Sequence, residues 1–186
     1  FSDDRGVFVD VARGSDSNAG DRRRPFASIE RALSAASGKN LPIYVAAGIY
    51  DASRIVFPDG VSLHGGFLSD DAEAFSSRDF RSLESKYRTA ISRQDLPVTM
   101  AISASDVWLG GFHFENASNI FDHLKPSSTI LVRGGSVTVD RSRVSGNPSS
   151  PDDLTVFSSG GDLRISKSII DAGGIDAPGA GGCAIK

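Results

Sequence analysis

The sequence predicts an all-β protein: a right-handed parallel β-helix with one α-helix covering its N-terminal end. Three observations support this fold class. They are short strands of alternating hydrophobicity, a segment that recurs after 30 and 26 residues (from Asp106, Ser136 and Asp162), and one amphipathic helix near the start. The chain has 186 residues and is 39% hydrophobic, which is enough for one core. We expect a single domain over 1–186, with a strand, a turn and the capping helix in 1–40 and coils in 41–186.

The capping helix is predicted from Pro25 to Ser37. Pro25 suits a first helical position, because its missing N–H would have no partner there. Gly38 tolerates the positive φ at which helices often end. The helix buries one apolar stripe, formed by residues at near-helical spacing: Phe26, Ile29, Leu33 and Ala36.

Most of the chain after this helix alternates apolar and polar residues with a period of two, which is typical of strands. The clearest segments are Ile43/Val45, Ile55/Phe57, Val61/Leu63, Val107/Leu109, Phe112/Phe114, Ile130/Val132, Val137/Val139 and Leu163/Ile165. Gly-Gly, Ser-Gly and Asn-Pro pairs mark the turns between them. A long, polar and partly helical excursion is expected at about 69–88.

Three segments can be superimposed: DVWLGGFHFEN from Asp106, SVTVDRSRVSG from Ser136 and DLRISKSIIDA from Asp162. Each contains two strands joined by a bend, and such a repeat is typical of stacked coils. The superposition predicts three inward columns: Val107–Val137–Leu163, Leu109–Val139–Ile165 and Phe114–Val144–Ile170. It predicts three outward columns: Trp108–Thr138–Arg164, Gly110–Asp140–Ser166 and His113–Arg143–Ile169. A β-sandwich is the alternative architecture, but it predicts tight hairpins instead of strand–bend–strand units.

The N-terminal third carries a more specific pattern over residues 7–67. VFVDVARGSDSNAGDRRRPFASIERAL is followed by IYVAAGIY and then by DGVSLHGGF. This series resembles the N-terminal part of bacterial right-handed parallel β-helix proteins of the pectate-lyase-like superfamily. The resemblance implies an exported protein, located outside the cell, at its surface or in the periplasm, whose opening helix covers the open edge of the coil stack.

The C-terminal stretch GAGGCAIK resembles the start of another coil, although Cys183 is inserted into the pattern. A solenoid needs a cap at its end. We therefore expect the chain to be the N-terminal part of a longer protein, or another chain to cover this end.

Composition excludes several classes of function. The formal net charge is −3, and the basic run from Arg22 to Arg24 has acids close by, so we expect no nucleic-acid partner. The sequence contains no apolar run of about 18 residues, so no membrane span is predicted. The single cysteine, Cys183, rules out an internal disulfide.

The opening loop offers candidate metal ligands, Asp16, Asn18 and Asp21, whose oxygens suit Ca²⁺. It lacks the lysine and the glycine spacing of a phosphate-binding loop. Short polar side chains also bond their own backbone in turns, while a glycine such as Gly20 takes positive φ. We expect a structural turn without a cofactor, and calcium is the alternative.

Two side chains in the outward columns indicate the function. Trp108 offers a stacking surface for a sugar ring, and Arg164, two coils further on, can reach a carboxylate or a hydroxyl. We expect a scaffold or recognition module without catalysis, whose partner is a polysaccharide or another surface protein. In the other interpretation, the excursion covers Trp108 and makes it a core residue. The resemblance implies a further alternative, a polysaccharide lyase acting on acidic polysaccharide, with Asp140, Arg143 and Arg164 as catalytic candidates.

The three histidines, His64, His113 and His123, have no metal-like spacing, and we expect them to be structural or merely exposed. The sequence contains no Gly-x-Ser-x-Gly elbow, the motif that would indicate a serine nucleophile. The residue types of a Ser-His-acid triad are nevertheless all present.

Overall fold

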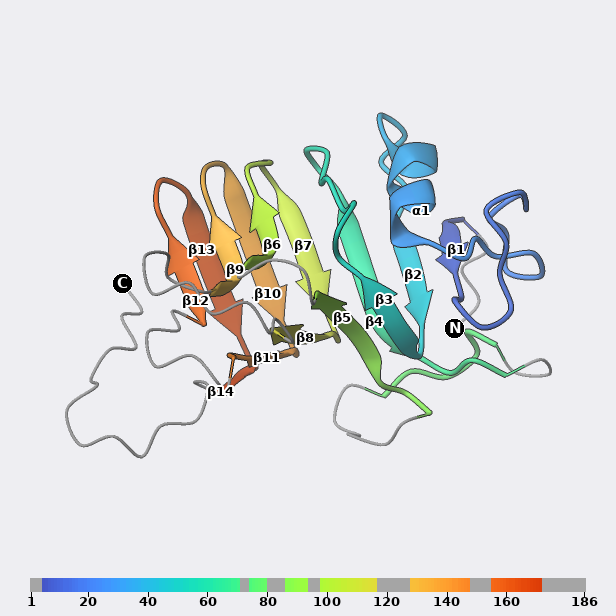
Figure 1. Cartoon of the computed structure of the whole chain (residues 1–186). Helices are drawn as coiled ribbons and strands as arrows, with labels where there is room; N and C mark the ends of the chain where they lie inside the picture. Colours follow the sequence, from blue (N-terminus) through green and yellow to red (C-terminus); the bar gives the residue numbers. More distant parts are fainter. Residues whose placement is uncertain are drawn as a thin grey trace.

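The computed structural model describes residues 5–70, 74–79, 86–93, 98–116, 128–147 and 155–171, and it shows a parallel β-helix (Figure 1). The described strands form three sheets, and every pair of neighbouring strands within them is parallel. From residue 62 onward the described strands lie in sheets A, B and C in turn, and each circuit stacks on the one before. This topology confirms the predicted β-helix, because a sandwich would contain antiparallel pairs.

Sheet A has six described strands: β1 (Val7–Val9), β2 (Ile43–Ala46), β4 (Ser62–Phe67), β7 (Val107–Gly110), β10 (Ser136–Asp140) and β13 (Asp162–Ser166). Sheet B has five: β3 (Gly48–Asp51), β5 (Thr89–Arg93), β8 (His113–Asn116), β11 (Arg143–Ser145) and β14 (Ile169–Asp171). Sheet C has three: β6 (Val98–Ile102), β9 (Ser128–Val132) and β12 (Val156–Ser158).

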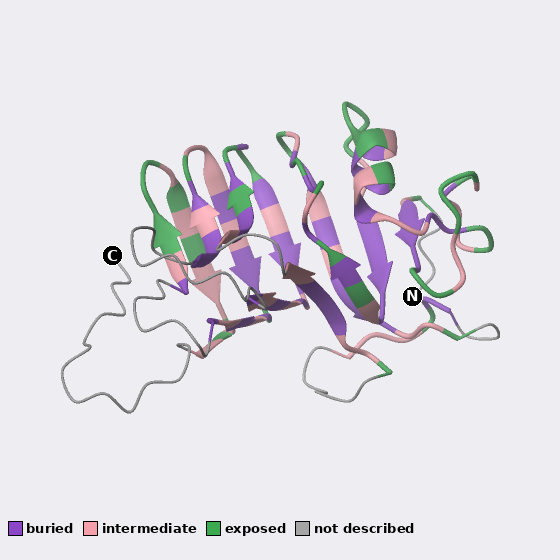
Figure 2. Cartoon of the chain, viewed as in Figure 1, coloured by how far each residue is buried: buried purple, intermediate pink, exposed green. Residues whose placement is uncertain are grey.

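The predicted register is confirmed across the last three coils. Val137 pairs with Val107 on one side and with Leu163 on the other, and Val144 pairs with Phe114 and Ile170. The inward columns fill the core, and burial decreases at the last coil, where β13 is partly exposed (Figure 2). Ile55 and Phe57 are buried as expected, but they lie outside any strand, so the strand predicted there is wrong.

Serines replace phenylalanine at one corner of the coils. Ser142 and Ser168 occupy the bends that correspond to Phe112. The Ser142 hydroxyl accepts the N–H of Phe112 at 3.2 Å and donates to the carbonyl of Asp140. Ser168 repeats this one coil later by accepting the N–H of Ser142 at 3.1 Å. A polar side chain therefore fits this corner because it satisfies backbone groups that the bend leaves without a ladder partner.

Helix α1 runs from Ile29 to Ala36, so the predicted start at Pro25 is wrong. Residue Phe26 instead forms a parallel bridge with Val9, and its backbone extends the first coil. The helix begins at the N-cap Ser28, whose hydroxyl accepts the N–H of Arg31 at 3.2 Å. It ends as predicted beside Gly38, which has φ +72°. In the described residues, no helix is long and apolar enough to cross a membrane.

The segment between β4 and β5 folds over the outer face of sheet A. Its described residues form turns and a bridge between Phe67 and Arg78, with no helix, so the predicted helical content is absent from that part. Phe75 is fully buried, with its ring 4.9 Å from that of Phe8. It completes a second apolar cluster, outside the main core: Phe8, Tyr44, Ala46, Phe67, Ala74 and Phe75. The first three coils of sheet A are therefore covered on the outside.

Candidate functional site

We call the described residues of the segment between β4 and β5 the cover over sheet A, and Arg78 lies within it. Its guanidinium donates from Nε to the carbonyl of Gly65 at 2.7 Å and from Nη2 to the carbonyl of Gly110 at 3.0 Å. We call the outer surface of β7, β10 and β13 the A face. It begins where this guanidinium is anchored, and it holds two of the three predicted outward columns.

Trp108 stands at the start of the A face, with its indole over Gly110. A Cβ added to Gly110 would lie 2.1 Å from the indole Cη2, so only glycine leaves room for the ring. The His64 ring lies 4.5 Å away, and Tyr44 lies 5.4 Å beyond His64. The indole thus ends a row of stacked rings and stays partly exposed. Sequence reasoning missed the roles of His64 and Gly110; the Trp-x-Gly spacing within one strand was the available signal.

Asp140 lies one coil further on, in β10, where it is in register with Gly110. Its carboxylate accepts the hydroxyl of Ser166 and lies 3.0 Å from Nη1 of Arg141. Arg164 is exposed on β13, in register with Thr138 and, through it, with Trp108. Neighbouring strands are about 4.8 Å apart, so the three strands that carry Trp108, Asp140 and Arg164 span about 10 Å.

The predicted catalytic candidates do not form one cluster. Asp140 and Arg164 share the A face, whereas Arg143 lies on the outer face of sheet B and forms an ion pair with Asp171. No described contact joins Arg143 to either of the other two residues.

The candidate calcium ligands each bind groups of their own loop. The Asp16 carboxylate accepts the N–H groups of Ala27 and Ser28 at 3.0 and 2.9 Å. Asn18 donates to the carbonyl of Pro25 at 2.9 Å. The Asp21 carboxylate accepts backbone N–H groups that follow it and pairs with the Arg24 guanidinium, and the N–H of Arg24 is the main cause that lowers the pKa of Asp21. Within the described ranges, no three His, Cys, Asp or Glu side chains gather as a metal site would require.

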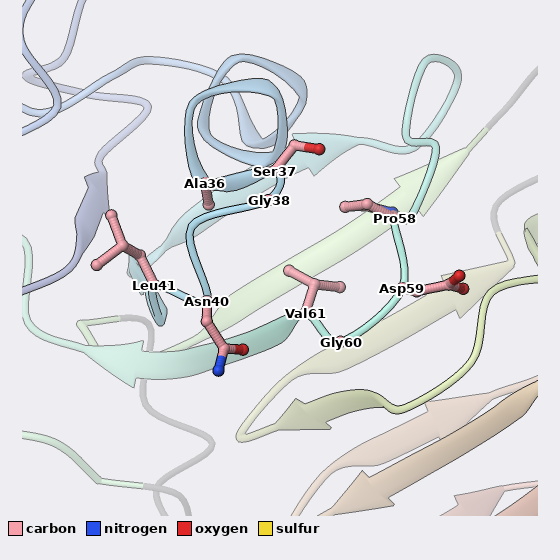
Figure 3. A pocket seen from close by; sticks show the side chains of 9 residues that line it. All are labelled: Ala36, Ser37, Gly38, Asn40, Leu41, Pro58, Asp59, Gly60 and Val61. Atoms are coloured by element: carbon pink, nitrogen blue, oxygen red, sulfur yellow. The ribbon is translucent and has the colours of Figure 1, made fainter.

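A pocket of about 240 Å³ lies between the end of α1 and the loop before β4 (Figure 3). Its lining is Ala36, Ser37, Gly38, Asn40, Leu41, Pro58, Asp59, Gly60 and Val61. Asp59 is the one acid among these residues, and its carboxylate already accepts the N–H of Ser105 at 2.7 Å. The one carboxylate of the pocket is therefore already engaged by the chain itself, and the A face is the better candidate.

His64 makes the fold sensitive to acid. Burial is the main cause that lowers its pKa from 6.5 to about 4, and the charge of Arg78 adds to it. Because the pKa is lowered in the folded state, neutral His64 stabilises the protein above pH 6.5, and this stabilisation is lost as the pH falls towards 4. We predict that between pH 7 and pH 4 the wild type loses about 2–3 kcal/mol more unfolding free energy than the His64→Phe variant, as measured by urea unfolding. Parallel pH profiles for the two proteins would contradict this prediction.

Comparison with known proteins identifies the family of the chain. Residues 12–158, well over half of the sequence, match the family described as "Protein of unknown function (DUF1565)". The chain therefore belongs to the DUF1565 family, and its parallel β-helix is the fold on which the A face is built. Comparisons with curated proteins and with solved structures gave no match.

Proposed function

We propose that this protein is an exported recognition scaffold that binds a polysaccharide along the A face. The observation that carries the proposal is the Trp108 indole, held over Gly110 at the edge of the cover and followed by Asp140 and Arg164 in the next two coils. Export rests on the resemblance of residues 7–67 to exported β-helix proteins.

The chemistry of Trp108, Asp140 and Arg164 suits a sugar chain. A pyranose has an apolar C–H face, which stacks on an aromatic ring, and a rim of hydroxyls, which bond to carboxylates and guanidinium groups. Asp140 is mostly buried, and its two oxygens accept from the Ser166 hydroxyl and from Arg141, so it holds these two side chains in place on the A face. The charges of Arg141 and Arg164 favour a glycan that carries carboxylates. A glycan that follows the axis of the coil stack would meet these groups in order.

Binding to immobilised oligogalacturonates and neutral β-glucan oligomers tests this proposal. We expect the wild type to bind the acidic series, and Trp108→Ala to weaken that binding at least about tenfold, which corresponds to about 1.4 kcal/mol. Gly110→Ala should act similarly, because the new methyl group would displace the indole without touching the ligand.

Ile49→Ala is the matched control, since Ile49 is 66% exposed and lies on sheet B. This variant should bind as the wild type does. Equal binding by the wild type and by Trp108→Ala would refute the site, and the absence of binding to either glycan series would refute the proposed ligand class.

A further inference from the structure

The outer face of sheet B carries a polar network that the A face does not use. On this face, His113 pairs in register with Arg143, and the next outward row is Glu115, Ser145 and Asp171. Arg88, immediately before β5, reaches across to the same place. We call these six residues the B-face network: Arg88, His113, Glu115, Arg143, Ser145 and Asp171.

A serine, a histidine and a carboxylate follow one another in this network. The Oγ of Ser145 lies 3.3 Å from Nε2 of His113, and this ring nitrogen is the one hydrogen-bond partner of the Ser145 side chain in the described part of the chain. On the other side of the ring, Nδ1 lies 3.3 Å from Oε1 of Glu115. The three groups have the order of a nucleophile, a base and the carboxylate that orients the base.

The backbone that carries these groups is held from sheet C. Thr129 donates its hydroxyl to the carbonyl of Ser145 at 2.8 Å, and Thr99 does the same to the carbonyl of Glu115 at 3.1 Å. Both threonines are fully buried. Ser145 and Glu115 are therefore attached to rigid strands and not to loops, which favours a fixed geometry.

Two groups compete for Nδ1 of His113. The Nε of Arg88 donates to it at 3.2 Å, and the same guanidinium pairs with Glu115. When Nδ1 accepts from Arg88, the ring proton is on Nε2 and faces Ser145. When Nδ1 carries the proton and donates to Glu115, Nε2 has a free lone pair that can take the proton of Ser145. Only the second tautomer is a base towards the serine.

We propose that Ser145, His113 and Glu115 form a nucleophilic site that hydrolyses small carboxylic esters. Ser145 Oγ adds to the ester carbonyl while its proton passes to Nε2 of His113. The C–O bond to the alcohol then breaks, and the alcohol leaves with that proton. Water adds to the acyl-serine, gives a proton to His113, and the carboxylic acid leaves as the proton returns to Ser145.

Arg143 supplies charge where the oxyanion forms. It lies two residues before Ser145 on the same face of β11 and beside His113 in register. Its Nε donates to Asp171, which fixes the guanidinium, and among the described residues its other N–H groups stay available for a developing negative charge.

The environment of His113 also sets the pH range. Burial is the main cause that lowers the pKa of His113. Arg88 and Arg143 lower it further, while Glu115 and Asp171 oppose the shift. A base must be unprotonated to act, so the rate should be constant at neutral pH and fall only below the ordinary histidine value of about 6.5.

Turnover of p-nitrophenyl acetate and labelling by a fluorophosphonate test the proposal on the full chain. We expect a phosphonyl adduct on the Ser145 peptide by mass spectrometry, and at least about a hundredfold loss of kcat/KM in Ser145→Ala. Ser92→Ala removes a serine from the strand next to Glu115 and should keep full activity. The absence of an adduct on Ser145, or equal turnover by Ser145→Ala and wild type, would overturn the proposal.

The positioning role of Glu115 has its own test. Glu115→Gln should lower kcat about tenfold or more, because it favours the unproductive tautomer, whereas Arg88→Gln should raise kcat, because it removes the donor that competes with Glu115 for Nδ1 of His113. A merely structural role would lower the activity of both variants together. That result, with the adduct still on Ser145, would overturn the assignment of Glu115.

Discussion

Replacing Phe75 with alanine is expected to cost about 3–5 kcal/mol of unfolding free energy. Phe75 is fully buried, packs edge-on against Phe8 at 4.9 Å and lies 5.9 Å from the ring of Phe67. Its backbone takes φ +60°, which an alanine would keep without gaining the packing. The variant would therefore retain the backbone strain and lose the contacts that offset it.

Urea unfolding measures this loss, and hydrogen exchange locates it. The amides of Phe75 and Asp79, bonded to Leu68 and Gly66, should exchange faster in the variant because the cover over sheet A opens. Val56→Ala is the control, since Val56 is 79% exposed and its truncation should change stability by less than about 0.5 kcal/mol. A similarly small effect of Phe75→Ala would show that the cover does not depend on this ring.

Asp10→Ala is expected to have the second-largest effect, about 3 kcal/mol or more. Asp10 has no exposed surface, and one carboxylate oxygen accepts the N–H groups of Ala12 and Arg13 at 3.0 and 3.2 Å. The other oxygen accepts the hydroxyl of Ser69 at 2.8 Å and lies 3.7 Å from the Arg13 guanidinium. Alanine would remove the acceptor of the two N–H groups and of the Ser69 hydroxyl, all of them partly buried, and it would also remove the carboxylate beside the Arg13 guanidinium.

Asp10→Asn separates hydrogen bonding from charge, because an amide oxygen still accepts the two N–H groups. It should cost about half as much as Asp10→Ala in urea unfolding at pH 7. A double-mutant cycle with Ser69→Ala measures the link between the first coil and the start of the cover. A coupling energy of zero would show that the Asp10–Ser69 hydrogen bond contributes nothing.

The repeated coils were predictable because their residues obey a simple period. Val107, Val137 and Leu163 stack as the superposition requires, since each coil must bury the same face against its neighbours. The start of α1 was not predictable in the same way. Pro25 satisfies a helix rule, but Phe26 gains more by pairing with Val9 and entering the core.

The candidate sites were predictable only in part. The column Trp108–Thr138–Arg164 follows from the repeat, and its register is confirmed. The contributions of Arg78 to the A face and of Arg88 to the B-face network could not be predicted, because both residues lie in a segment without periodic hydrophobicity. The outward row of Glu115, Ser145 and Asp171 could have been predicted, since it continues the superposition two residues beyond His113 and Arg143.

Intrinsic fluorescence tests the proposed recognition at the A face most directly. Trp108 is the only tryptophan in the chain, so its emission reports this site alone. We expect a saturable change in emission during titration with oligogalacturonate, with the same midpoint as binding measured by calorimetry, and a weaker response in Gly110→Ala. Calorimetric binding that reaches saturation while the emission of Trp108 stays unchanged would place the ligand elsewhere and contradict the proposed function.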